Sequence, residues 1–481
     1  MRTAAGPRPL PTATPTSQGI EPAGIAGLLE ELDADSRIEP HSLVIMRRGS
    51  VVASGWWRPF SSSRLQRVHS ISKSFTSTAL GLAIDEGLLS LDDPVVELVW
   101  DARSFPRDNR GILVRHLLSM ASGHSWDTWH DAVGRDPGDP ARGFLDLPVD
   151  GNPGITFAYN QSCTYTLAAI LQRLTGQRLS EYLRPRLFDP IGIGDVVWSR
   201  YDGAGELGYG GLHLQTDALA RFGELYRQHG RWGSTQVLPA GWVHEASRTH
   251  VATPGGPGPD WGLGYGYQFW ISRHGFRADG AFGQFCLVLP DQHLVVAMTA
   301  ATLDMQAVLD AIWQHLLPVV QDRPLAAAAD EDDLLTRLNT LAIPTQRDLR
   351  GSPDQVLPWL AGSFEVVSAG GRPPFDRILL NADPTGGTWR LTLDAGDDRV
   401  TISFRPSAWS VTNGSTGSAG SLPVAVTGGW RADGDLELHL LFLETPHRLL
   451  LTCSSSSSTA HSRWFTEPPH GDRLADLRAH V

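Results

Sequence analysis

Lysine is nearly missing from this chain: Lys73 is its only lysine, and arginine supplies the rest of the 40 basic side chains. Cysteine is scarce as well. Cys163, Cys286 and Cys453 form no C-x-x-C pair, so we expect buried free thiols rather than a disulfide framework. A chain without disulfides fits a reducing compartment, and we therefore expect a cytoplasmic protein.

Excess positive charge and long apolar runs are also absent. A net charge of −12 argues against nucleic acid and against an anionic membrane surface as partners. No apolar run approaches the ~18 residues of a membrane span. Residues 1–18 are rich in Pro, Ala and Thr and lack the continuous apolar stretch of a secretory signal. We expect them to form a disordered tail.

Residues 19–322 mix helical and strand patterns, which predicts an α+β domain. Apolar residues recur at helical spacing after Ser70, up to Gly87, and again over 162–175 and 217–230. Residues 42–57 predict two strands around a turn at Arg48-Gly49. The apolar or β-branched runs 265–272, 285–290 and 294–300 predict neighbouring antiparallel strands.

The pattern changes after residue 322. Residues 323–350 are typical of a linker that carries one short helix. Residues 351–481 contain short alternating strands separated by Gly, Asp, Pro and Ser turns, with a strong hairpin signal at Asp433-Gly434. This spacing predicts a separate all-β domain, a barrel or a sandwich. Its role stays open among capping a pocket, mediating dimerisation and binding an apolar ligand.

Ser70 and Lys73 suggest why one lysine is retained. They are three residues apart at the start of a predicted helix, and residues at this spacing share a helix face. A serine hydroxyl needs a base to become a nucleophile. Arginine cannot serve because it does not deprotonate in proteins, whereas a buried lysine can. The pair therefore favours a serine nucleophile activated by an amine.

A longer stretch carries a family resemblance. The segment "HSISKSFTSTALGLAIDEGLLSLDDPV" resembles the active-site segment of the serine β-lactamase and penicillin-binding-protein superfamily, nearest its class C and esterase-like branch. Residues 114–124, 153–193, 210–243 and 279–298 continue the resemblance in order, so that it covers roughly residues 40–315. It implies a transpeptidase-type fold, with an antiparallel sheet flanked by helices plus a helical subdomain. Some members carry a lipocalin-like β-domain behind it.

The resemblance implies roles for individual residues. Ser70 would be the acyl-forming nucleophile, and Lys73 its base or proton relay. Tyr159 matches the tyrosine of the second motif, where a phenolate could accept the serine proton and later protonate the leaving group. Gln161 stands where the motif has asparagine and would bind substrate. Asn160 lies next to it and is a second candidate for substrate binding.

The third motif departs from the family pattern. Its usual Lys-Thr-Gly or His-x-Gly falls on Ala278, Asp279 and Gly280, so the cation that helps to hold a substrate carboxylate is missing. This disfavours β-lactam hydrolysis and favours the esterases, amidases and 6-aminohexanoate-dimer-hydrolase-like members. Gly280 would let substrate approach the strand closely. The N–H groups of Ala281 and Ser70 would form the oxyanion hole.

Other motifs are weak. Residues 203–208 form G-x-G-x-x-G, but a glycine-rich loop follows them rather than a helix. "HEASRTH" has Arg248 where a zinc motif needs histidine. No G-x-S-x-G motif is present. We expect neither a metal nor a cofactor.

Three functions remain open at this stage. The first is a serine hydrolase that acts on esters, amides or small peptides through an acyl-enzyme on Ser70. The second is a thioesterase or peptide cyclase of penicillin-binding-protein type, with an amine as acceptor; the missing third-motif cation counts against it. The third is a non-catalytic binding protein with a degenerate site, which Gln161 and Ala278 favour and the intact Ser70, Lys73 and Tyr159 oppose.

Overall fold

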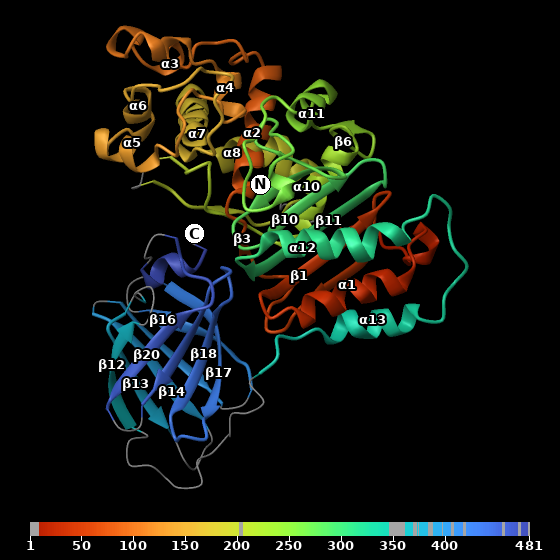
Figure 1. The fold of residues 1–481 in the computed structure, drawn as a ribbon, viewed down its shortest axis with the longest axis vertical. Coiled ribbons are helices and arrows are strands. Elements are labelled where there is room, and N and C mark those ends of the chain that lie inside the picture. Colours follow the sequence, from red (N-terminus) through yellow and green to blue (C-terminus); the bar gives the residue numbers. More distant parts are fainter. Residues whose placement is uncertain are drawn as a thin grey trace, which may run out of the picture.

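A computed structural model describes residues 9–201, 205–345 and 361–479, with short gaps at 369–372, 374, 383–387, 397, 406–407, 417–419, 455–456 and 470–472. Two bodies lie side by side (Figure 1). One is an α+β body that contains all the described residues up to 345, and the other is a β-barrel formed by later residues.

An antiparallel sheet forms the centre of the α+β body. Its strand order is β2 (Ser50–Trp56), β1 (Ile38–Arg47), β11 (Leu294–Thr302), β10 (Gln284–Leu289), β9 (Gly275–Gly280) and β8 (Trp270–Ser272). Every residue of β1 and of β11 is buried, which requires cover on both faces. Figure 1 shows α1 (Pro22–Ala34), α12 (Met305–Ala311) and α13 (Glu331–Thr340) on one face, and α10 (Thr216–Arg227) on the other.

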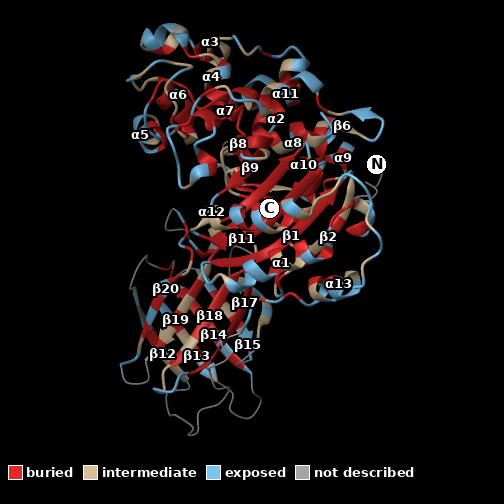
Figure 2. Cartoon of the chain, turned by 45° about the vertical axis from the view of Figure 1, so that its right-hand side comes forward, coloured by how far each residue is buried: buried red, intermediate tan, exposed pale blue. Residues whose placement is uncertain are grey.

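A helical lobe extends from one end of this sheet. Its longest helix is α7 (Gln161–Thr175), which packs against α2 (Ile71–Asp85), α4 (Val114–Leu118), α6 (Pro140–Leu145) and α8 (Leu179–Leu183). Apart from Lys73 and Asp85, the helix α2 contains only apolar or small residues, and it is almost wholly buried because it contacts both the lobe and β9 (Figure 2). A residue in its first turn is therefore held from two directions.

Shorter elements complete the α+β body. They are α3 (Val95–Val99), α5 (Trp129–Arg135), α9 (Asp189–Ile191), α11 (Ala240–Ser247), β3 (Gln66–Arg67), β4 (Val197–Trp198), β5 (Leu212–Leu214), β6 (Arg231–Trp232) and β7 (Thr235–Gln236). The strands β3, β5 and β4 form a small sheet, and its strand β3 lies just before α2 in the chain.

The later residues form a closed barrel. Its strands are β12 (Ala361–Ser368), β13 (Arg377–Ala382), β14 (Trp389–Ala395), β15 (Asp398–Phe404), β16 (Ser410–Thr416), β17 (Gly420–Trp430), β18 (Leu436–Phe442), β19 (Arg448–Cys453) and β20 (Thr459–Trp464). Neighbouring strands are antiparallel, and β12 closes the barrel by pairing with β20 in parallel. Alternate side chains such as Ile378, Leu393, Ile402 and Leu438 are buried together inside.

Most of the expected elements are confirmed. The helices predicted at 70–86, 162–175 and 217–230 are α2, α7 and α10; α7 ends at Gly176, whose φ is +67°. The hairpin over 42–57 is β1 and β2, and Asp433-Gly434 lies in the turn between β17 and β18. Of the barrel and the sandwich, the barrel is correct. Cys163, Cys286 and Cys453 are buried free thiols, as expected.

Three expectations need correction. Residues 265–269 are not a strand; β8 begins at Trp270 and pairs with β9. The tail predicted over 1–18 is ordered from residue 9, since Pro11 and Ala13 form backbone hydrogen bonds with Val51, and residues 1–8 lie outside the described residues. The linker helix, α13, is part of the α+β core, where Leu334 and Leu338 are buried. Among the described residues, no helix combines the length and the apolar character that a bilayer crossing requires.

Candidate active site

Ser70 and Lys73 meet at the start of α2. Ser70 is the residue that caps the helix, and Lys73 lies one turn later with 1% of its surface exposed. The Nζ atom of Lys73 lies 2.9 Å from the Ser70 hydroxyl and 2.9 Å from the backbone carbonyl oxygen of Tyr209. The amine is therefore held between the candidate nucleophile and a fixed acceptor.

Burial changes the protonation of this amine. It lowers the pKa of Lys73 to about 7, because removal of water disfavours the charged form; the carboxylates of Asp127 and Asp279 act in the opposite direction. A substantial fraction of Lys73 is then neutral at neutral pH. A neutral amine can accept a proton from Ser70 Oγ across the same 2.9 Å contact through which the ammonium donates.

Tyr159 completes the group. It immediately precedes the N-cap of α7, its ring centroid lies 4.8 Å from Lys73 Nζ, and its ring stacks on Trp270 at 5.4 Å. Burial raises the pKa of Tyr159 above its usual value, Asp279 raises it further, and a hydrogen bond with Ser70 opposes this. The phenol therefore stays protonated, so the predicted phenolate base is not supported. This geometry suits a proton donor instead.

The two neighbouring amides have different surroundings. Asn160 is fully buried as the N-cap of α7: its Oδ1 accepts hydrogen bonds from the N–H of Ser162 and of Thr128. These bonds occupy its side chain, so the prediction that Asn160 binds substrate is corrected to a structural role. Gln161 lines the pocket, and its Oε1 has no hydrogen-bond partner among the described residues.

The third motif lies on β9, as its register predicted. Ala278 is buried, and the buried Asp279 accepts a hydrogen bond of 2.9 Å from Arg277, whose guanidinium lies 4.5 Å from the Trp261 ring. Arg277 is thus confined to the core and does not replace the missing cation in the pocket.

The two residues that follow Asp279 have different surroundings. A Cβ at Gly280 would lie 2.2 Å from the carbonyl oxygen of Val68, so this glycine permits close packing against the chain just before Ser70 rather than against substrate. Ala281, the next residue, is exposed and lines the pocket with Ser70.

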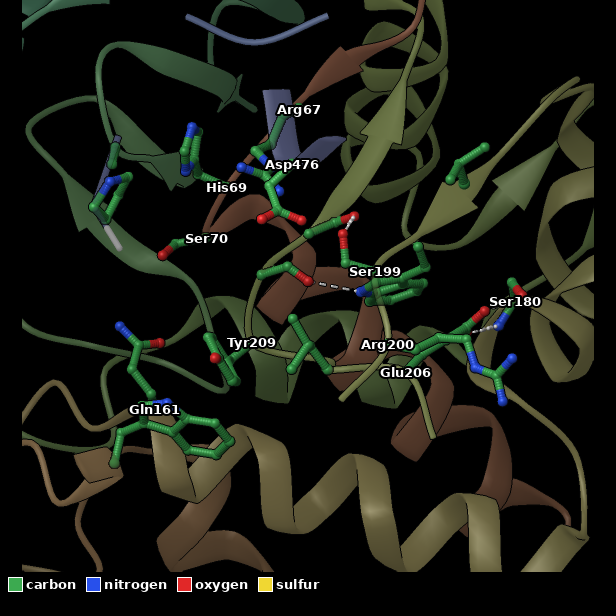
Figure 3. A pocket seen from close by; sticks show the side chains of 18 of the residues that line it. Arg67, His69, Ser70, Gln161, Ser180, Ser199, Arg200, Glu206, Tyr209 and Asp476 are labelled. Carbon is green, nitrogen blue, oxygen red and sulfur yellow. Dashed lines mark hydrogen bonds between the residues drawn. The ribbon is translucent and has the colours of Figure 1, made fainter. Parts of the chain in front are cut away.

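The pocket has a volume of about 880 Å³. Figure 3 shows Ser70 on one side, with Gln161 and Tyr209 below it and Arg67 and Asp476 above. Ser180, Arg200 and Glu206 lie further from Ser70 in this view. Pro469, Arg473 and Asp476, which follow the last barrel strand, also line the pocket. The C-terminal part thus forms one wall, which agrees with the capping role that the sequence left open.

Sequence reasoning missed several pocket residues. Asp127 lies in the loop before α5, and no local pattern distinguishes it from the other acidic residues. Tyr209 contributes through its backbone carbonyl, which carries no sequence signal. Arg67 precedes Ser70 by three residues, and only its place beside the nucleophile could have indicated a role.

The motifs judged weak do not form sites in the described part of the chain. Within it, no three or more His, Cys, Asp or Glu side chains are arranged to hold a metal ion, and His244 lies in α11. The glycine-rich residues 203–204 are outside the described residues, and 205–208 lead to a loop rather than a helix.

Comparisons with known proteins agree with this geometry. A family model described as Beta-lactamase matches residues 25–318, more than half of the chain. The chain is 27% identical over 249 residues to a protein named 6-aminohexanoate-dimer hydrolase from Paenarthrobacter ureafaciens. That alignment covers 48% of this chain and 63% of the relative, so less than two thirds of the relative is represented.

Solved structures share the fold at low identity. A putative 6-aminohexanoate-dimer hydrolase from Bacillus anthracis has a TM-score of 0.52 at 18% identity, covering 64% of this chain and 88% of that one. The crystal structure of SurE has a TM-score of 0.50 at 19% identity and covers 88% of this chain and 98% of that one. The latter share is larger than the α+β body, so it includes part of the barrel.

Proposed function

This chain belongs to the beta-lactamase family, and on that premise we propose that it is a serine hydrolase that forms an acyl-enzyme on Ser70. The observation that carries the proposal is the 2.9 Å contact between Lys73 Nζ and Ser70 Oγ, made by an amine whose pKa burial lowers to about 7. A lysine with only a structural role would not need to lie against a serine hydroxyl. A lysine that acts as the base for that hydroxyl must contact it.

The reaction divides the proton transfers between two side chains. Ser70 Oγ attacks the carbonyl carbon of an ester or amide, and its proton passes to neutral Lys73. The protonated phenol of Tyr159 donates to the leaving group, and the proton now on Lys73 replaces the one that Tyr159 loses. The N–H groups of Ser70 and Ala281 hold the oxyanion. Water then cleaves the acyl-enzyme and regenerates Ser70.

The substrate is an ester or amide rather than a β-lactam. Ala278 and Asp279 occupy the third motif, and Arg277 is buried away from the pocket, so the strand offers no cation for a carboxylate beside the reacting carbonyl. The relative named 6-aminohexanoate-dimer hydrolase supports an amide substrate of this kind. Gln161, with its unpartnered amide oxygen, is suited to hold an N–H of the substrate.

The test uses a fluorophosphonate probe, which labels only an activated serine, together with p-nitrophenyl esters. We expect wild-type protein to be labelled on Ser70 and to release nitrophenol, and Ser70→Ala to do neither. Ser77→Ala is the matched control, since the Ser77 hydroxyl, also on α2, donates to the carbonyl of Tyr267 and contacts neither Ser70 nor Lys73. Unlabelled wild-type protein would instead indicate the non-catalytic binding protein.

A separate experiment tests whether water or an amine accepts the acyl group from Ser70. Added amines compete for an acyl-enzyme when the site accepts them, and amide products then appear at the expense of acid. We expect acid as the product at all amine concentrations. Predominant amide formation would favour the cyclase or thioesterase alternative.

A further inference from the structure

Two strained residues flank the proposed oxyanion donors. His69, directly before Ser70, has φ +47°, and Phe282, directly after Ala281, has φ +69°. Residues other than glycine rarely adopt this left-handed region, because the Cβ crowds the backbone. Such conformations persist only when the surrounding structure enforces them. Something must hold these two backbones in place.

Their rings meet a third ring from the barrel. The ring centroids of His69 and Phe282 are 5.2 Å apart, edge to face. His447 lies 6.0 Å from His69 and 5.3 Å from Phe282, in nearly perpendicular contact with both. His447 belongs to the turn between β18 and β19, so the cluster joins both sides of the oxyanion hole to the C-terminal body.

The barrel holds the His447 ring in a fixed orientation. Its Nδ1 lies 3.1 Å from the carbonyl oxygen of Thr466, just after β20, and His447 is 1% exposed. Its Nε2 has no hydrogen-bond partner among the described residues. Burial lowers the pKa of His447 to about 3 and holds the pKa of His69 well below its usual value, so both rings are uncharged. The contact is one of packing rather than of charge.

The turn that carries His447 is itself attached next to the nucleophile. The N–H of Arg67 in β3 donates to the carbonyl oxygen of Glu444 at 2.9 Å, and the Gln66 amide donates to that of Leu443. A partly buried ion pair between Arg448 and Glu39 connects the start of β19 to β1. Movement of the turn would therefore be transmitted to residues 66–70.

We propose that His447 is a positioning residue for the oxyanion hole, and that the barrel is in this way a working part of the active site. The inference rests on the proposed function of Ser70. Without the His447 ring, His69 and Phe282 can relax toward negative φ. That relaxation turns the peptide group that carries the Ser70 N–H and shifts the backbone beside Ala281. An oxyanion hole stabilises charge only when its donors are already in place.

The experiment compares variants of the full-length chain. We measure the rate of fluorophosphonate labelling of Ser70, and kcat and KM with p-nitrophenyl esters. His447→Ala is expected to slow labelling and lower kcat by ~10–100-fold with little change in KM, because the loss falls on the transition state. His447→Phe, which keeps a ring but loses the bond to Thr466, is expected to recover most of the rate.

Two further variants distinguish a loss of positioning from a loss of stability. Ile402→Ala removes a buried side chain inside the barrel, away from the cluster, and should lower the melting temperature while leaving kcat unchanged. Phe282→Ala removes the same contact from the other side and should reproduce the loss if His447→Ala does not fold. Ser70 labelling of His447→Ala at the wild-type rate, or an equal kcat loss in Ile402→Ala, would overturn this inference alone. Absence of Ser70 labelling in the wild type would overturn the proposed function, and this inference with it.

Discussion

Lys73 Nζ lies 2.9 Å from the carbonyl oxygen of Tyr209, a residue 136 positions further along the chain. A carbonyl can only accept, so this bond fixes one N–H of the amine. The other contact of the amine is with Ser70 Oγ at the same distance. When Lys73 is neutral, the Tyr209 carbonyl therefore orients the nitrogen so that its lone pair is available to the serine proton.

The pH dependence of catalysis should follow the protonation of the Lys73 amine. Its amine must be neutral to act as a base, and burial lowers its pKa to about 7. We expect kcat/KM to rise with pH up to about 7 and then to level off, since kcat/KM reports the free enzyme. Asp127 stabilises the ammonium, so Asp127→Asn should lower the pKa and move the rising limb to lower pH. Asp131→Asn, which removes an exposed carboxylate bonded to Trp126, should leave the limb in place; a limb that does not move in Asp127→Asn would contradict the assignment.

Removing the buried amine should stabilise the fold while abolishing activity. The unfolded chain keeps Lys73 protonated up to its usual pKa of 10.5, whereas the folded chain releases the proton near pH 7. Between these values the unfolded state binds more protons, so wild-type stability rises with pH in this window. We expect Lys73→Met to be more stable at pH 7, by up to roughly 4 kcal/mol at about 1.4 kcal/mol per pKa unit, and to lose this part of the pH dependence. Thermal melting at pH 7 and pH 9.5 measures both; a lower melting temperature at pH 7 would contradict it.

The phenol of Tyr159 should matter for turnover and not for the fold. Tyr159→Phe keeps the ring that lies 4.8 Å from Lys73 Nζ and its stacking on Trp270, but removes the proton donor. We expect kcat to fall by ~10²–10⁴-fold, the usual range for acid–base groups, with an unchanged melting temperature. The control is Tyr226→Phe, which removes a buried hydroxyl bonded to Thr78 at 2.7 Å and should cost stability but not kcat. Equal effects of the two substitutions on kcat would argue against Tyr159 as the donor.

Substitutions of Gln161 and Asn160 should have different effects, the first on substrate binding and the second on the stability of the fold. Gln161 lines the pocket with an unpartnered amide oxygen, so Gln161→Ala should raise KM by about tenfold, the value of one hydrogen bond, without lowering the melting temperature. Asn160→Ala removes the cap of α7 and the bonds to Thr128, and should cost about 1–2 kcal/mol of stability instead. Steady-state kinetics and thermal melting of the pair distinguish the roles. The reverse pattern would show that Asn160 is the substrate ligand.

The sequence predicted elements whose signals are local. The helices α2, α7 and α10 have clear apolar spacing, and the hairpins at Arg48-Gly49 and Asp433-Gly434 have turn residues. The strand β9 was recognised only through its motif, because Gly275, Arg277 and Asp279 weaken any strand pattern. It is a strand because β8 and β10 pair with it on both sides and because Arg277 and Asp279 neutralise each other in the core. Tertiary packing overrides local preference there.

By itself the sequence determined the pairing of Ser70 with Lys73, because helix geometry places residues three apart on one face wherever the helix lies. It also determined that later residues form strands, since alternation and turn residues are local. Only the tertiary structure decided that the lysine loses its proton near pH 7, because that depends on how completely the surrounding chain excludes water. The same holds for the contact of the Tyr209 carbonyl with Lys73 and for that of His447 with His69: each joins residues far apart in the chain, and packing alone brings them together.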